Sequence, residues 1–173
     1  MGEQCEDLSV DHAFSAEEIA RLVAALGADD TLCPLVVKGT SMSPTLREGR
    51  DTVYLRSVGP DDELRRGDVI FFWRGPQVVL HRLIKVLPDG RLRVNGDNQL
   101  WCEEVAREDV FAVAEQVGRG HRVMPLRSGA LGAWGAVWMR LLPLREAIWH
   151  LPRPVKDAAV RLGSALRGGR RRG

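Results

Sequence analysis

The spacing of hydrophobic residues near the N-terminus predicts a short helix. Ser15 and Glu18 match a capping box, in which each side chain bonds the backbone amide of the other residue. Apolar residues then recur every three or four positions, which places them on one face of a helix. These residues are Ile19, Leu22, Val23 and Leu26. Gly27 supplies a C-terminal stop, so we expect an amphipathic helix over residues 16–26.

From residue 31 the pattern changes to short runs rich in Val, Ile, Leu and aromatic residues, separated by Gly, Pro and Asp. Such runs are typical of strands. Many short strands with little helix between them predict a mainly β, antiparallel core. Pro88-Asp89-Gly90 is expected to form a hairpin turn. The expected strands are 34–38, 51–56, 68–73, 77–86, 91–95 and 110–117.

A second helical pattern begins after about residue 127. Two apolar faces are expected, and Pro143 interrupts the chain between them. The first face contains Leu131, Trp134, Val137, Trp138, Leu141 and Leu142, and the second contains Val155, Ala159, Leu162 and Leu166. The patterns divide the chain into an acidic N-terminal segment with a helix (1–30), a β-rich domain (31–126), an amphipathic helical segment (127–167) and a basic tail (168–173).

The composition is that of a folded domain. Hydrophobic residues make up 45% of the 173 residues, which is enough to form a core. The three cysteines, Cys5, Cys33 and Cys102, form neither a disulfide framework nor a metal-ligand spacing, and they favour a reducing compartment. We therefore expect no metal and no cofactor.

The net charge is only +2, but the charges are unevenly distributed. Residues 1–30 contain eight acidic residues and one arginine, a net charge of −7. Residues 151–173 contain seven basic residues and one acidic residue, a net charge of +6. The two ends could attract each other, the basic end could bind an acidic surface, or both ends could simply be solvated.

No secretory signal is expected, because the N-terminus is acidic and lacks an apolar stretch with a small-residue cleavage site. The uncharged run 128–139 has 12 residues, fewer than the roughly 20 that span a bilayer. We therefore expect a cytoplasmic protein whose helical segment docks peripherally on an anionic membrane surface. The same segment could instead pack on the β domain or on a second copy of the chain. Its apolar area comes from Trp134, Trp138, Leu141, Leu142 and Trp149, and its charge from Arg140, Arg145, Arg153, Lys156, Arg161 and Arg167.

Residues 37–49 are the most informative segment for chemistry. The segment follows a short expected strand, and its small residues favour a turn. A serine in such a turn, here Ser41, can point outward while its own amide donates to an oxyanion. Taken alone, a Ser-Met-x-Pro turn is also compatible with an ordinary structural serine. The neighbouring motifs therefore decide between a catalytic and a structural role for Ser41.

Four motifs together resemble type I signal peptidases and the self-cleaving repressors related to them. In chain order they are Ser41-Met42-Ser43-Pro44-Thr45-Leu46, Gly67-Asp68-Val69-Ile70-Phe71-Phe72, Val79-Leu80-His81-Arg82-Leu83-Ile84-Lys85-Val86 and Gly96-Asp97-Asn98-Gln99. They resemble the family's nucleophile box, its Gly-Asp-hydrophobic strand, the strand that carries the base, and its Gly-Asp-Asn box. The resemblance covers residues 37–99 and extends by strand pattern to about residue 124. It implies a signal-peptidase-like antiparallel β domain that acts as a serine endopeptidase on a peptide or protein substrate.

The resemblance implies Ser41 as the nucleophile and His81 as the general base. Bacterial signal peptidases and the repressors use a lysine on the base strand, whereas the endoplasmic-reticulum, archaeal and sporulation types use a histidine followed by an arginine. His81-Arg82 matches the histidine type. Lys85 lies roughly 13 Å further along the strand and Lys38 precedes the turn, so neither occupies the base position. A neutral imidazole can accept the serine proton near pH 7.

Two acids are candidates for orienting His81. Asp97 belongs to the Gly-Asp-Asn box, and Glu103 stands where histidine-type relatives have a second aspartate. Asp97 is slightly favoured, because its motif is complete. Thr40 and Met42 are expected to support the nucleophile or the oxyanion. Asp68, Arg82 and Asn98 are expected to be structural residues near the site, Asp68 through an Asx-type turn.

The chain departs from the family in two further ways. Gly39 stands where many relatives have a hydroxyl residue, which predicts a weaker oxyanion hole. The roughly 30 residues before the strands are expected to hold neither a membrane anchor nor a DNA-binding domain. We expect an endopeptidase that cleaves an extended peptide or leader, and the alternative is a non-catalytic peptide-binding or regulatory module that retains the fold. Nucleic-acid binding is not expected, because no aromatic and basic residues interleave on a strand.

Overall fold

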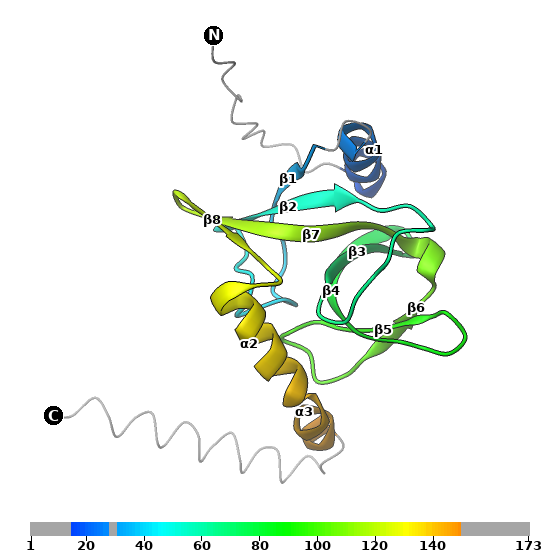
Figure 1. Cartoon of the computed structure of the whole chain (residues 1–173), viewed down its shortest axis with the longest axis vertical. Coiled ribbons are helices and arrows are strands. Elements are labelled where there is room, and N and C mark those ends of the chain that lie inside the picture. Colours follow the sequence, from blue (N-terminus) through cyan, green and yellow to red (C-terminus); the bar gives the residue numbers. More distant parts are fainter. Residues whose placement is uncertain (1–14, 28–30, 150–173) are drawn as a thin grey trace, which may run out of the picture.

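The computed structural model describes residues 15–27 and 31–149, and the fold is mainly β (Figure 1). The antiparallel strands follow the order β1-β2-β7-β3-β4-β5-β6, and β8 pairs with β7 beside this path. The expectation of a mainly β, antiparallel fold is thereby confirmed. The strands are β1 (Cys33–Val36), β2 (Asp51–Ser57), β3 (Val69–Arg74), β4 (Gln77–Val86), β5 (Leu92–Asn95), β6 (Glu103–Val105), β7 (Val110–Arg119) and β8 (Arg122–Pro125), with a 3-10 helix, η1 (Arg107–Asp109), before β7.

The first helix, α1 (Ala16–Gly27), confirms the predicted N-terminal helix and its capping box. The Ser15 amide donates to Glu18 Oε2 at 2.7 Å, and the Glu18 amide donates to Ser15 Oγ at 3.2 Å. Val23 on the inner side of the helix is buried in the core. The helix therefore covers the part of the sheet formed by β1, β2 and β7 (Figure 1).

The strands bury two hydrophobic clusters, one on each face of β3 and β4. Because side chains alternate along a strand, Phe71 enters one cluster while Ile70 and Leu83 enter the other. Met42 and Leu46, from the segment between β1 and β2, join the cluster of Phe71. The loop that carries the candidate nucleophile is thereby anchored in the core.

The hydrophobic pattern misses two of the strands, β6 and β8. Both are short, and in β6 two of the three residues are glutamates, so neither strand shows an apolar alternation. They are strands because neighbouring strands pair with them: β5 pairs with β6, and β7 with β8. The omission of β6 matters for function, because β6 carries Glu103.

The turn at residues 88–90 joins β4 to β5 as predicted. The Leu87 amide donates to the Arg91 carbonyl at 2.8 Å, and the Gly90 amide donates to the Leu87 carbonyl at 3.0 Å. Gly90 has a positive φ of 85°, which glycine adopts without steric cost. The turn thus sets the start of the register between β4, which carries His81, and β5.

Two helices follow the sheet, and they lie beside the loops that hold the signal-peptidase-like motifs (Figure 1). They are α2 (Gly129–Arg140) and α3 (Leu142–Trp149). The predicted interruption at Pro143 is displaced. The break lies at Leu141, and Pro143 stands in the first turn of α3, where a proline's missing amide costs no helical hydrogen bond.

The prediction of one apolar face over these helices is partly wrong. Val137 and Leu141 are 49% and 41% exposed, whereas Leu142 is buried. Trp138 and Arg145, both named as membrane-facing, instead bond the β domain. Val137 and Trp138 are neighbours in α2 and therefore point to different sides of the helix, one to the surface and one to the β domain. Packing on the β domain is therefore observed for the inner face.

None of the helices within residues 15–27 and 31–149 is long and apolar enough to cross a membrane. The second predicted apolar face, in residues 155–166, and the basic tail at 168–173 lie outside the described residues. The acidic stretch before residue 15 also lies outside them.

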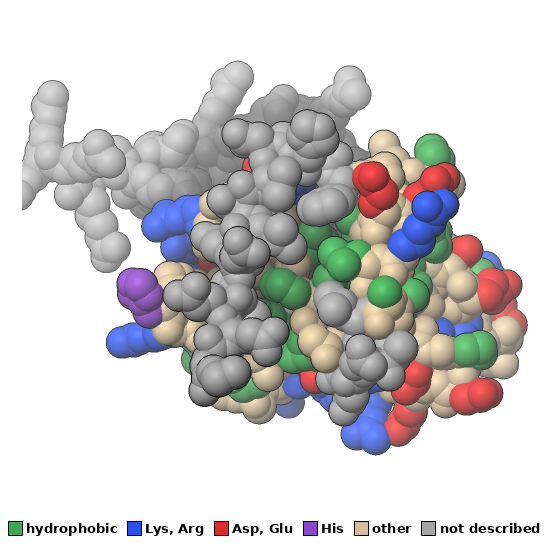
Figure 2. Space-filling model, turned by 90° about the horizontal axis from the view of Figure 1, so that it is seen from above, with side chains coloured by type: hydrophobic (Ala, Val, Ile, Leu, Met, Phe, Trp, Pro, Cys, Tyr) green, Lys and Arg blue, Asp and Glu red, His purple; other side chains and the backbone are tan. Residues whose placement is uncertain are grey.

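Acidic and basic side chains mix on the described surface (Figure 2). Arg56 pairs with Glu115 at 2.6 Å, and Arg91 pairs with Asp89 at 2.7 Å and with Glu104 at 2.5 Å. Such exposed pairs contribute about 0–1 kcal/mol each. The buried ion pairs lie inside the domain, such as the pair of Arg82 and Asp97.

Candidate active site

The loop between β1 and β2 presents Ser41 beside buried anchors. Met42 and Leu46 lie in the core, and the Leu46 amide donates to the Met42 carbonyl at 2.9 Å. The Ser43 amide donates to the Thr40 carbonyl at 3.0 Å, which closes a turn around Ser41. Ser41 itself is half-buried. The loop therefore holds the serine at the edge of the core with its backbone fixed, and Met42 supports it as predicted.

A buried carboxylate clamps the far end of this loop. Asp51 at the start of β2 accepts from the Arg47 amide at 3.0 Å and from Arg119 Nε at 2.9 Å. Arg119 Nη2 also donates to the Thr45 carbonyl at 3.1 Å. Burial acts to raise the pKa of Asp51, but the hydrogen bonds and charge of Arg119 lower it on balance below its ordinary value. The clamp therefore stabilises the fold above the unfolded pKa of about 3.9, and this contribution is lost as pH falls through the lower folded value.

The Gly-Asp-Asn box forms the surface against which Ser41 rests. The Asn98 amide donates to the Ser41 carbonyl at 2.7 Å. A Cβ atom at Gly96 would lie 2.8 Å from the same carbonyl oxygen, so this close approach requires glycine. The two motifs are thus brought together through the backbone, and the role expected for Asn98 as a structural residue near the site is fulfilled by its amide.

Strand pairing brings the same loop to His81. Arg82 of β4 pairs with Asn95 of β5. Gly96, the residue after Asn95, therefore lies opposite His81, the residue before Arg82. Since Gly96 abuts the Ser41 carbonyl, the loop of Ser41 and the strand of His81 both lie next to the loop of residues 96–99.

The strand register places His81 and Glu103 on one face of the sheet. Leu83 pairs with Val94, and Val94 pairs with Glu103, so these three side chains share a face. His81, two residues before Leu83, points to the same face. Its Nδ1 atom lies 2.7 Å from Glu103 Oε1.

The surroundings of His81 favour a neutral imidazole. The residue is only 1% exposed, and the Phe72 ring packs edge-on against it at 5.9 Å between centroids. This burial lowers the pKa of His81 below its ordinary value; Glu103 opposes the shift, and Arg74 adds to it. With the proton on Nδ1 facing Glu103, the other ring nitrogen is an acceptor. Among the described residues, Nε2 of His81 has no hydrogen-bonding partner.

Asp97 contacts a different residue. Both of its oxygens accept from Arg82, at 2.9 Å from Nε and 2.8 Å from Nη2, and the Thr45 hydroxyl also donates to it. Asp97 and Arg82 are both almost completely buried. The slight preference for Asp97 as the acid that orients His81 is therefore wrong, because Glu103 makes that contact and Asp97 neutralises Arg82.

The oxyanion side of the loop depends on backbone geometry. Gly39 has a φ of +79°, and its amide donates to Glu48 Oε1 at 2.8 Å. Thr40 is exposed. Within the part of the chain that the structure describes, the Ser41 amide donates to no acceptor. That amide is the donor the loop offers to a developing oxyanion.

The sequence reasoning missed Arg74 at the end of β3. Ile70 pairs with His81, so alternate residues of β3 place Arg74 on the face of His81. Arg74 forms an ion pair with Glu103 through the same oxygen that contacts His81. The alternation of side chains along β3 indicates which residues share a face with Arg74. It places Arg74 next to His81 only once the register of β3 against β4 is known.

Asp68 has the structural role expected of it. Its carboxylate accepts from the Arg65 amide at 2.7 Å, and its own amide donates to the Arg65 carbonyl at 3.0 Å. Its carbonyl accepts from the Leu83 amide at 2.7 Å. Asp68 therefore closes an Asx-type turn that fixes the start of β3 against β4.

Comparison of the chain with protein-family models and with curated proteins finds no match.

Proposed function

We propose that the chain is a serine endopeptidase of the signal-peptidase type, with Ser41 as nucleophile, His81 as general base and Glu103 as the acid that orients it. One observation carries the proposal. Nδ1 of His81 lies 2.7 Å from Glu103, while the buried Nε2 has no hydrogen-bonding partner among the described residues. The strand register sets His81 opposite Gly96, which abuts the Ser41 carbonyl. A histidine with one nitrogen bonded to an acid and the other an unused acceptor is the arrangement of a general base.

The proposed reaction assigns one step to each of these residues. Nε2 of His81 takes the proton of the Ser41 hydroxyl, whose oxygen attacks the scissile carbonyl, and the Ser41 amide donates to the oxyanion. Glu103 stabilises the imidazolium, which then protonates the leaving amine. Water, deprotonated by His81, hydrolyses the acyl ester and returns Ser41 to its starting state.

An extended peptide is the proposed substrate. β1 is an end strand among the strands that the structure describes, so its outer edge, just before the Ser41 loop, has no neighbouring strand within that part of the chain. A substrate strand added at this edge would present its carbonyl toward the loop. Pro34 lacks an amide donor, so pairing there relies on the carbonyl groups and on the remaining amides.

A covalent labelling experiment tests the proposal. A serine-directed fluorophosphonate probe is expected to add one adduct to the intact protein, at Ser41, because His81 activates that hydroxyl. Intact-mass and peptide mass spectrometry would locate the adduct. Ser41→Ala should abolish labelling and His81→Ala should slow it by orders of magnitude, whereas Ser43→Ala, two residues away in the same loop, should label normally. An adduct elsewhere, or none with folded wild-type protein, contradicts the proposal.

The second candidate function is a non-catalytic module that binds peptides and retains the fold. The observation that favours it is Gly39, because the oxyanion site has no side-chain donor at that position. Such a module would bind an extended peptide without forming an adduct with the probe. The labelling experiment therefore separates the two functions.

We also propose that the outer side of α2 and α3 contacts an anionic membrane surface. Val137, Leu141 and Leu144 are exposed there, Leu144 to 61%, and the exposed Arg140 lies among them. Apolar side chains next to basic ones suit an interfacial contact. The expectation of a cytoplasmic location stays a prediction.

Vesicle co-sedimentation checks this contact. Wild-type protein is expected to pellet with phosphatidylserine-containing vesicles at low salt and to stay in solution with neutral ones. The Leu141→Glu, Leu144→Glu double variant should lose most of this binding. Val86→Glu, which changes an equally exposed residue on the β4–β5 hairpin, should not. Equal pelleting of all proteins, or none of the wild type, would refute the contact.

A further inference from the structure

The loop of residues 96–99 is held from outside by side chains of α2 and α3. Trp138 Nε1 donates to the Asp97 carbonyl at 2.7 Å. Arg145 Nη2 donates to the Asp97 carbonyl at 2.8 Å and to the Gln99 carbonyl at 2.5 Å. Arg145 is buried, so these bonds are protected from water. The carbonyls on either side of Asn98 are thus fixed by the helices.

The same helices also reach the nucleophile loop. Trp134 Nε1 donates to the Thr45 hydroxyl at 3.1 Å, and that hydroxyl donates to Asp97. Trp134 and Trp138, one helical turn apart, stack at 5.2 Å, and the Arg145 guanidinium lies 4.3 Å from the Trp138 ring centroid. One stack of three side chains therefore spans the two loops that contain Ser41 and the Gly-Asp-Asn box.

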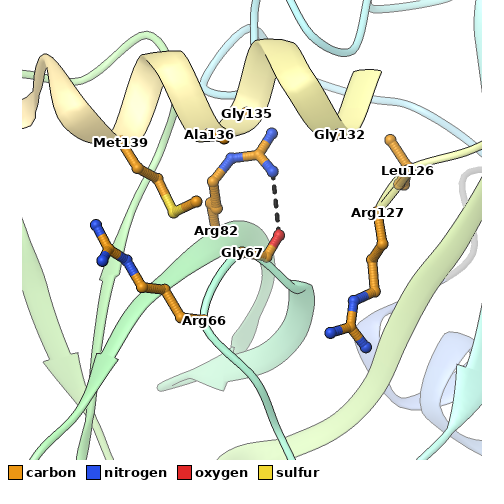
Figure 3. A pocket seen from close by; sticks show the side chains of 9 residues that line it. All are labelled: Arg66, Gly67, Arg82, Leu126, Arg127, Gly132, Gly135, Ala136 and Met139. Carbon is orange, nitrogen blue, oxygen red and sulfur yellow. Dashed lines mark hydrogen bonds between the residues drawn. The ribbon is translucent and has the colours of Figure 1, made fainter. Parts of the chain in front are cut away.

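The position of α2 is defined by close contact with a buried charge. Figure 3 shows the Arg82 guanidinium beneath α2, beside Gly135, with its bond to the Gly67 carbonyl. A Cβ atom at Gly135 would lie 2.7 Å from Arg82 Nη1, so a larger residue here would force either the helix or the Arg82 guanidinium to shift. Since Arg82 also binds Asp97, the helix, the base strand and the loop meet at one guanidinium.

We propose that Arg145 is a positioning residue for the reaction, and that α2 and α3 together form a brace that sets the position of Ser41. Arg145 fixes the carbonyls of Asp97 and Gln99, which aims the Asn98 amide between them at the Ser41 carbonyl. A nucleophile must be held within a fraction of an ångström of its productive place, so a loosened brace slows the chemical step more than it weakens binding. This inference rests on the peptidase activity proposed for the site.

Arg145→Met tests the brace, because methionine keeps an apolar stem but removes the donors. We expect kcat for a peptide substrate, or the rate of fluorophosphonate labelling at Ser41, to fall about 10- to 100-fold with KM little changed. Arg145→Lys, which restores one donor, should recover part of the rate. The acid limb of the pH profile should not move, because Arg145 touches neither His81 nor Glu103. Arg122→Met, which changes an exposed arginine of β8, is the control.

A second measurement does not depend on activity. Hydrogen exchange of the Asn98 amide, followed by NMR, should be faster in Arg145→Met than in wild type and in Arg122→Met, while amides of β7 keep their protection. Faster exchange without any labelling of the wild type would contradict the proposed peptidase function and leave the brace standing. Unchanged exchange and an unchanged rate in folded Arg145→Met would overturn the brace.

Discussion

Glu103→Gln is expected to lower kcat by a factor of about 10²–10⁴ while KM changes little. The glutamate lies 2.7 Å from Nδ1 of His81, where it selects the tautomer that leaves Nε2 free to accept a proton. Glutamine keeps the size of the side chain but can donate to Nδ1, which stabilises the wrong tautomer. It also removes the negative charge that stabilises the imidazolium, a species formed mainly in the transition state. Steady-state kinetics on an extended peptide would measure the effect.

Glu104→Gln is the matched control, because Glu104 is adjacent in β6 but pairs with Arg91 on the exposed side. It should have near-normal kinetics. If Glu103→Gln turned over as fast as this control, the site would work as a Ser-His dyad and the role of Glu103 would be disproved.

The dependence of kcat/KM on pH is an independent test of His81 as the base and Glu103 as its acid. Burial lowers the pKa of His81, so the acid limb of kcat/KM should lie below the ordinary histidine value of about 6.5. Glu103 opposes that shift, so Glu103→Gln should move the limb to still lower pH. Arg74 contributes to the lowering, so Arg74→Gln should move the limb upward. Shifts in the same direction for both variants would contradict this arrangement of charges.

Asp97→Asn is expected to reduce the free energy of unfolding by about 3–5 kcal/mol. The substitution leaves the buried Arg82 guanidinium without its counter-charge, and it weakens the bond from the Thr45 hydroxyl. The cost is large because both partners of the pair are almost completely buried. Chemical denaturation followed by circular dichroism would measure it.

Asp89→Asn serves as the control for this prediction. Asp89 also pairs with an arginine, but both side chains are half exposed, so its loss should cost about 0–1 kcal/mol. Similar unfolding midpoints for the two variants would mean that the Arg82–Asp97 pair does not hold the loop. A folded Asp97→Asn protein that loses only activity would instead return Asp97 to the catalytic group.

The pattern of hydrophobic and polar residues predicted most of the fold, because most of these elements depend on interactions between residues close in the sequence. The capping box of Ser15 and Glu18 and the turn before Arg91 are bonds between near neighbours, and the structure contains both. β6 could not be found in this way, because its glutamates show no alternation and its pairing partner determines it.

The sequence motifs identified the residues of the candidate site, but they did not predict which of these side chains contact each other. The order of the boxes placed Ser41 near His81, but the choice between Asp97 and Glu103 depends on which face of the sheet each side chain occupies. That is set by the registers of β4, β5 and β6, which join residues far apart in the chain. Arg74 was missed for the same reason, since its face is defined only by pairing with β4.

The backbone of Gly39 restricts how this site can change through mutation. A serine or threonine at that position would have to adopt a φ near +79°, which costs a residue with a side chain roughly 1–2 kcal/mol. The backbone conformation that the new residue would have to adopt is the one in which the amide of residue 39 donates to Glu48. A side-chain oxyanion donor gained here by one substitution therefore carries this cost in stability. A second change that lets the loop leave the positive φ would remove it, so the two changes are coupled.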